Sequence, residues 1–109
     1  MATNAILKMQ SREVPGRTAY RSVSLGAGDD TTPIKGIMRN DSVVVSLTGT
    51  VTSAMVETRM VDTDPWAACL SAAIAAPGSV CLFNVLDQVR VTVTTGAGVF
   101  ATILVRRPS

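Results

Sequence analysis

The feature that most constrains this chain of 109 residues is a two-residue alternation of β-branched and polar side chains. Across residues 88–95, valines such as Val91 occupy every second position and face the core, while Arg90 and the threonines face the other way. Residues 55–61 alternate in the same manner, with Met60 on the side opposite the charged pair Glu57 and Arg59, which faces water. Valine (15 residues) and threonine (13) are abundant throughout the chain, and both favour strands. The sequence therefore predicts an all-β protein.

Short segments of this kind recur about every ten residues, with glycine, proline or aspartate turns between them. This spacing is typical of a small antiparallel β-sandwich or a jelly-roll-like barrel of six to eight strands. We expect Gly96-Ala97-Gly98 to form the loop of a hairpin between the last two strands. The expected strands are 20–25, 34–39, 42–48, 55–61, 79–86, 88–95 and 99–106.

Residues 65–76 carry two conflicting signals. Pro65 after Asp64, followed by several alanines, suits the first turns of a helix. The strands on either side and the aspartate-rich turn before Trp66 instead favour a strand. We favour the strand and keep the helix as the alternative. We expect Trp66 to fill a gap in a core or an interface, with a sugar-binding platform as the alternative.

The chain changes character near residue 40, because residues 1–40 are rich in cations and in turn-forming residues. We expect residues 1–40 to form an extended N-terminal arm with at most short strands, and residues 41–109 to form the β-sandwich domain. Four regularly spaced cations of the arm are candidates for binding an acidic protein partner, with a solvated arm as the alternative. They are Lys8, Arg12, Arg17 and Arg21. We do not expect nucleic-acid binding, because the net charge is only +2 and no aromatic residues are interleaved.

The last predicted strand is apolar on both faces, which is typical of a strand covered by a partner or placed centrally in a sandwich. Its bulky residues are candidates for a homo-oligomer interface. They are Val99, Phe100, Ile103 and Leu104.

The chain contains no histidine, the commonest general base and metal ligand. The pairs Asp29-Asp30 and Asp62-x-Asp64 lack the glycine and distal glutamate of a helix-loop-helix calcium site. Aspartates at strand turns usually bond their own backbone instead. We therefore expect no enzymatic activity, no cofactor and no bound metal.

Two cysteines, Cys69 and Cys81, are too few for a disulfide framework, so we favour free thiols and keep a bridge as the alternative. The first residues lack the basic start and long apolar run of a secretion signal, so we expect folding in a cytoplasm. The longest apolar stretch, 66–76, is shorter than the roughly 20 residues of a membrane-spanning helix, so no membrane partner is expected.

Residues 41–107 resemble small β-sandwich virion proteins of tailed bacteriophages. The resemblance lies in the order of strands and turns: an apolar strand with glycine at 43–50, alternating valine and charge at 56–60, an aspartate-rich turn into Trp66, a Pro-Gly turn at 77–78, a closing strand at 89–96 and a terminal Arg106-Arg107. Pro65 stands where such modules often have glycine, and residues 1–40 match no part of them.

This resemblance implies a non-enzymatic structural virion protein, made and folded in the host cytoplasm. Its implied role is a capsid decoration or cement protein that clamps neighbouring shell subunits. The alternative is a neck, tail or fibre module that binds a sugar or a protein. The implied partners are the major capsid protein or another virion protein, and the implied assembly is a homotrimer or another homo-oligomer.

Overall fold

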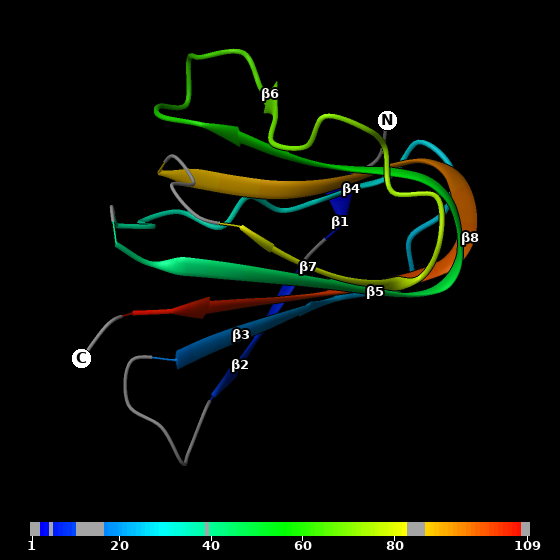
Figure 1. Cartoon of the computed structure of the whole chain (residues 1–109), viewed down its shortest axis with the longest axis horizontal. Helices are drawn as coiled ribbons and strands as arrows, with labels where there is room; N and C mark the ends of the chain where they lie inside the picture. Colours follow the sequence, from blue (N-terminus) through cyan, green and yellow to red (C-terminus); the bar gives the residue numbers. More distant parts are fainter. Residues whose placement is uncertain (1–2, 5, 11–16, 39, 83–86, 108–109) are drawn as a thin grey trace.

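The strands of this protein belong to one sheet that bends back on itself to form two layers (Figure 1). In this computed structural model the described residues are 3–4, 6–10, 17–38, 40–82 and 87–107. They include no helix, and so none that could cross a membrane. The predicted all-β fold is confirmed. The strands in chain order are β1 (Thr3–Asn4), β2 (Ile6–Gln10), β3 (Arg17–Ser22), β4 (Asp30–Thr31), β5 (Ser42–Arg59), β6 (Ala67–Ala68), β7 (Gly78–Leu82) and β8 (Gln88–Arg106).

Two long strands organise the sheet. β5 and β8 pair antiparallel from Ser42 opposite Arg106 to Arg59 opposite Gln88, and both curve through the same bend at the right of Figure 1. The first half of β5 and the second half of β8 form one layer with β7, β3 and β2, here called the β3 layer. The other halves form the β4 layer with β6, β4 and β1.

Glycines allow the two strands to bend together. Gly49 has a φ of 95°, and a Cβ atom there would overlap the carbonyl oxygen of Gly98 on the opposite strand. The register of β5 against β8 shifts at this bend. The hairpin predicted at residues 96–98 is therefore wrong, because β8 continues through its glycines and keeps β5 as its partner on both sides. For the same reason the strands predicted at 42–48 and 55–61 are a single strand.

The core lies between the two layers and comes mainly from alternate residues of β5 and β8. Val91 is fully buried, as predicted, and so are its counterparts along both strands. Each buried valine or leucine contributes roughly 1.5–3 kcal/mol relative to an exposed one. Met60, predicted to face the core, is 59% exposed because β5 ends at Arg59. The core residues are Leu25, Ile34, Ile37, Val43, Val45, Leu47, Val51, Ala54, Val56, Leu82, Val89, Val91, Val93, Val99, Ala101 and Ile103.

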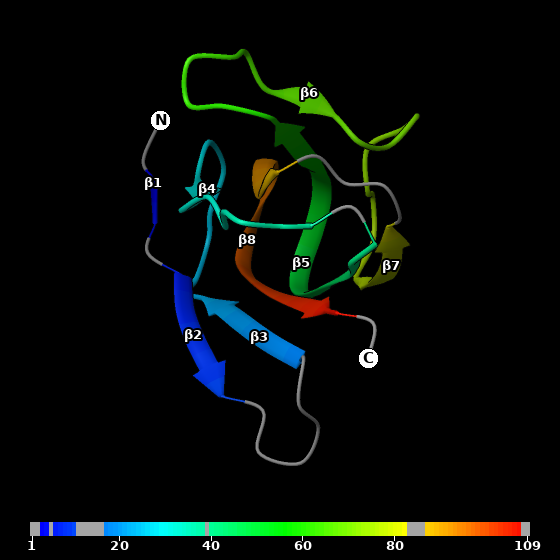
Figure 2. The ribbon, with the colours of Figure 1, turned by 90° about the vertical axis from the view of Figure 1, so that its left-hand side faces the viewer.

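The predicted division at residue 40 is not seen, because residues 17–38 are part of the sandwich. β3 pairs with β8 from Arg17 opposite Arg106 onward, while Leu25 and Ile34 form isolated bridges to β8 further along. Two hydroxyls complete the bonding of β8: Thr31 Oγ1 accepts from the Val91 amide, and Ser22 Oγ from the Ala101 amide. Among the described residues of this region no strand is longer than the six residues of β3. Figure 2 shows β2 on the far side of β3 from β8.

Residues 65–82 follow the outer side of β5 as an irregular edge. Only Ala67–Ala68 and Gly78–Leu82 form strands, and Ile74 makes an isolated bridge to Ala54 between them. Of the strand predicted at residues 65–76, only Ala67–Ala68 (β6) is present. The strand predicted at 79–86 is β7 as far as Leu82, and residues 83–86 lie outside the described part of the chain.

Candidate functional site

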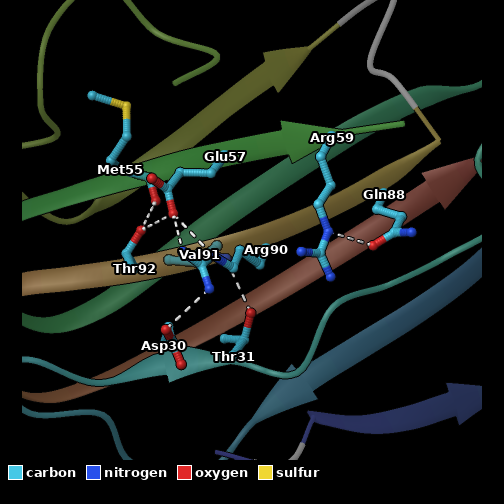
Figure 3. A network of polar contacts seen from close by, with 9 residues as sticks. All are labelled: Asp30, Thr31, Met55, Glu57, Arg59, Gln88, Arg90, Val91 and Thr92. Atoms are coloured by element: carbon cyan, nitrogen blue, oxygen red, sulfur yellow. Dashed lines mark hydrogen bonds and ion pairs between the residues drawn. The ribbon is translucent and has the colours of Figure 1, made fainter. Parts of the chain in front are cut away.

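The outer side of the β4 layer carries a cluster of charged side chains centred on Arg90 (Figure 3). Arg90 lies on β8 between carboxylates from two neighbouring strands. Its Nε and Nη2 lie 2.9 Å from Glu57 Oε1 on β5, and its Nη1 lies 3.2 Å from Asp30 Oδ2 on β4. Thr92 Oγ1 also donates to Glu57 Oε1 at 2.9 Å. The guanidinium therefore ties three strands together.

A second group of polar contacts continues the cluster toward the end of β5. Arg59 Nε donates to Gln88 Oε1 at 2.9 Å, and Gln88 Nε2 donates to Asp62 Oδ1 at 2.8 Å. Lys35 Nζ lies 3.0 Å from the same Asp62 oxygen. The hydrogen bonds from Gln88 and Lys35, with the nearby positive charges, hold the pKa of Asp62 below its usual value. Asp62 thus links the segment around Lys35 to the ends of β5 and β8.

Trp66 covers this cluster. Its ring centroid lies 4.2 Å from the guanidinium carbon of Arg59 and 4.4 Å from that of Arg90. The ring is half-buried. Guanidinium groups stacked on an indole are stabilised by its negative face, by about 0.5–2 kcal/mol each. Trp66 is not among the core residues, so the prediction that it fills a gap in a core is wrong, and its place in an interface stays a prediction. Its ring packs on the two arginines of the sheet.

The cluster is arranged to hold strands together. Its three cations, Lys35, Arg59 and Arg90, are matched by three carboxylates, Asp30, Glu57 and Asp62. Oδ1 of Asp30 is buried and has no hydrogen-bond partner among the described residues. Across all the residues that the structure describes, no group of three or more histidine, cysteine, aspartate or glutamate side chains is placed to hold a metal ion.

Asp29 and Asp41 show the turn chemistry that the sequence predicts for aspartates. Asp29 Oδ2 accepts from the Gly26 amide at 2.8 Å, and Asp41 Oδ2 accepts from the Met38 amide at 2.9 Å. Asp41 also binds Arg107, with two contacts of 3.3 Å. Burial raises the pKa of Asp41, but the bonds from Arg107 and Met38 outweigh it and leave the pKa below its usual value.

A different surface lies on the outer side of the β3 layer, where uncharged side chains form a continuous row. Ala19 on β3 lies beside Leu104 on β8, Leu104 beside Val44 on β5, and Val44 beside Cys81 on β7. Phe100 lies further along β8 on the same side, and the Arg21 guanidinium lies 5.1 Å from its ring centroid. These side chains are half-buried or exposed. We call the row together with Phe100 the outer face.

The four residues predicted as an oligomer interface divide between two environments. Val99 and Ile103 are fully buried in the core, so they are not available to a partner. Successive side chains of a strand point to opposite sides, and Phe100 and Leu104 therefore lie on the outer face. The second half of β8 is therefore apolar on both sides because one side packs in the core and the other belongs to the half-exposed outer face.

The predicted arm cations are placed only in part. Arg12 lies outside the described residues, as do the side chains of Lys8 and Arg17. In the backbone, Lys8 is opposite Tyr20 and Arg17 is opposite Arg106, so both belong to paired strands. Arg21 is exposed beside the outer face and stacks on Phe100.

Both cysteines are free thiols, as favoured from the sequence. Cys81 is exposed on the outer face, whereas Cys69 is half-buried. Burial raises the pKa of the Cys69 thiol, and the hydrogen bond with Thr58 only partly opposes this. Cys69 is therefore the less reactive of the two.

The sequence did not link the members of the charged cluster. Glu57 and Arg90 were both assigned to outward faces, but nothing in their spacing showed that they are neighbours. Their opposite charges become a signal only once Glu57 is known to lie opposite Arg90 in the pairing of β5 with β8.

Comparisons with known proteins identify the fold. No protein-family model and no curated protein matches the chain. A cupin domain from Bordetella pertussis Tohama I aligns with a TM-score of 0.55 and 12% identity, covering 100% of this chain and 99% of that one. The Cupin_2 domain of an XRE family transcriptional regulator from Enterobacter cloacae aligns with a TM-score of 0.58 and 10% identity, covering 95% and 96%.

An oxalate oxidase in complex with the substrate analogue glycolate aligns with a TM-score of 0.58 and 10% identity, covering 97% of this chain and 53% of that one. At such low identity the likeness shows only the cupin type of jelly-roll fold. These neighbours include an enzyme and a domain of a transcriptional regulator, so the fold does not decide the activity.

Proposed function

We propose that this protein is a non-enzymatic structural protein of a tailed bacteriophage particle, and that it binds a neighbouring virion protein through its outer face. The observation that carries the proposal is the uncharged row Ala19–Leu104–Val44–Cys81 with Phe100 beside it. An apolar sheet surface left half-exposed in one chain is typical of a protein contact.

The rest of the molecule agrees with a structural role. The barrel interior is filled by aliphatic side chains, and the polar cluster around Arg90 matches its charges internally. Trp66, the candidate platform for a sugar, lies against two arginines. We therefore favour capsid decoration over the alternative of a sugar-binding neck, tail or fibre module.

The first test is the copy number of the protein in purified particles, measured against the main shell protein by quantitative mass spectrometry. A ratio near one to one supports capsid decoration. A few copies per particle would move the protein to the neck, tail or fibre and favour the alternative. Absence from the particle overturns the proposal.

The second test addresses the surface itself. Leu104→Asp places a charge in the middle of the outer face, and we expect it to weaken binding to particles that lack the protein at least about tenfold. Thr94→Asp is the matched control, because Thr94 is exposed on the same strand in the other layer. Circular dichroism checks that both variants fold. Equal binding by folded Leu104→Asp and Thr94→Asp would exclude the outer face as the contact.

A further inference from the structure

The edge of the sheet beside β5 is irregular at the two-residue strand β6, but at β7 it is regular and carries no charge. β6 and β7 pair with β5, and no other strand of the described residues pairs with either of them. No charged residue occurs from residue 65 to residue 82. β7 is exposed at Gly78, Ser79 and Cys81.

Monomeric β proteins keep their edges apart with lysines, prolines within the strand, bulges or a covering segment. β7 has the sequence GSVCL, with no charge and no proline, and pairs with β5 in an unbroken register from Val43–Leu82 to Leu47–Gly78. An edge strand of this kind presents unpaired amides and carbonyls in regular geometry. It is suited to accept one more strand.

We propose that β7 pairs antiparallel with β7 of a second copy of this chain about a two-fold axis. This inference rests on the proposed function in that it adds a self-association surface to a structural protein. The absence of charge selects the occupant: two identical uncharged edges meet without repulsion, whereas a charged peptide would find no complementary group. Pairing all five residues places the axis at Val80.

This register has a specific consequence for side chains. Ser79 of one copy lies opposite Cys81 of the other, on the side of the sheet that carries the outer face. The outer faces of the two copies then join into one continuous uncharged surface. Two-fold pairing gives an even-numbered assembly, in place of the trimer implied by the phage resemblance.

The test is a charge swap at positions 79 and 81, both exposed, measured with the full chain by sedimentation equilibrium under reducing conditions. The double variant Ser79→Lys/Cys81→Lys places like charges opposite each other twice, and we expect at least about a tenfold weaker dimer. The double variant Ser79→Lys/Cys81→Glu places opposite charges at the same two contacts, and we expect the dimer to return. A merely structural effect of losing Ser79 and Cys81 would weaken both variants alike.

Cross-linking gives a second readout of the register. In a Cys69→Ser background, the two copies of Cys81 are diagonal neighbours about 7–8 Å apart, so a short bis-maleimide should join them. The variant Cys69→Ser/Cys81→Ser is the control and should give no covalent dimer.

The outcomes separate this inference from the proposed function. A dimer that survives the two lysine substitutions, a trimer, or a monomeric protein that still binds particles would overturn β7 pairing and leave the structural role standing. A monomeric protein that is also absent from particles would overturn both.

Discussion

Replacing Gly49 by alanine is the most direct perturbation of the bend that creates the two layers. Gly49 has a φ of 95°, a conformation that costs an alanine about 1–2 kcal/mol. The added Cβ would also overlap the backbone carbonyl of Gly98, so β5 and β8 would have to separate. Overpacking of this kind costs typically about 1–3 kcal/mol. We therefore expect Gly49→Ala to lower the free energy of unfolding by about 2–5 kcal/mol.

Two matched variants separate these contributions. Gly98 has a φ of 59° and open space around its Cβ position, so Gly98→Ala should lose only the conformational part, about 1–2 kcal/mol. Gly96 has no positive φ, but its Cβ would lie 2.7 Å from the Thr50 carbonyl oxygen. Gly96→Ala should therefore lose only the packing part, about 1–3 kcal/mol.

Urea unfolding at 25 °C, followed by circular dichroism, measures all three variants against the parent protein. The urea midpoint should shift while the m-value stays constant, if the native and unfolded states keep their exposed areas. For a domain of this size Gly49→Ala should also lower the melting temperature by roughly 8–20 °C. If Gly49→Ala is no less stable than Gly98→Ala, the close approach of the two strands at the bend is not what requires glycine.

Three further predictions concern the side chains described above. Asp41→Asn should cost about 1.5–3 kcal/mol at pH 7. The pKa of Asp41 in the folded state lies below its unfolded value of 3.8, so its contribution to the free energy of unfolding is complete above pH 3.8 and is lost as the pH falls through the folded pKa. If Asp41→Asn lowers the free energy of unfolding in urea equally at pH 7 and at pH 3, this reasoning is contradicted. Trp66→Ala should lower stability by about 2–3 kcal/mol in denaturation followed by circular dichroism, through lost burial and two lost arginine contacts, with Trp66→Phe in between. Cys81 should react with a thiol reagent at least about tenfold faster than Cys69, because Cys69 is half-buried. The two rates are measured in variants that keep one cysteine each, and equal rates would contradict the burial of Cys69.

The sequence predicts the fold class and the buried side of residues 88–95, because both depend on local alternation. Val89, Val91 and Val93 are buried as their spacing indicates, and Arg90 and Thr92 face outward. Alternation does not reveal which strands are neighbours. The glycines at 96 and 98 have the composition of a hairpin loop, and only the presence of Gly49 opposite them in the folded sheet makes them a bend.

The candidate surface was predictable only to a similar extent. The two-sided apolar character of residues 99–106 singled out Phe100 and Leu104, which lie half-buried on the outer face, and their place in an interface stays a prediction. Val99 and Ile103 were included because, within one strand, the sequence does not show which side faces the core. The charged cluster depends on pairings between residues 57 and 90 and between 30 and 90, far apart in the chain, and so had no local signal.

The pairing of β5 with β8 also determines how this chain reaches its native state. Paired residues are between 29 positions apart, at Arg59 and Gln88, and 64 apart, at Ser42 and Arg106. β3, β4, β6 and β7 each attach directly to one of these two strands. The chain must close these long loops before most favourable contacts can form. Folding should therefore take milliseconds to seconds, as is usual for proteins whose strands pair between residues far apart in the sequence. During synthesis β8 emerges after every other described strand. Until then β5 can pair with β6 and β7 along one edge, but its other edge has no partner and its core side stays uncovered by β8. A ribosome-bound chain that ends before residue 88 should therefore remain sensitive to protease.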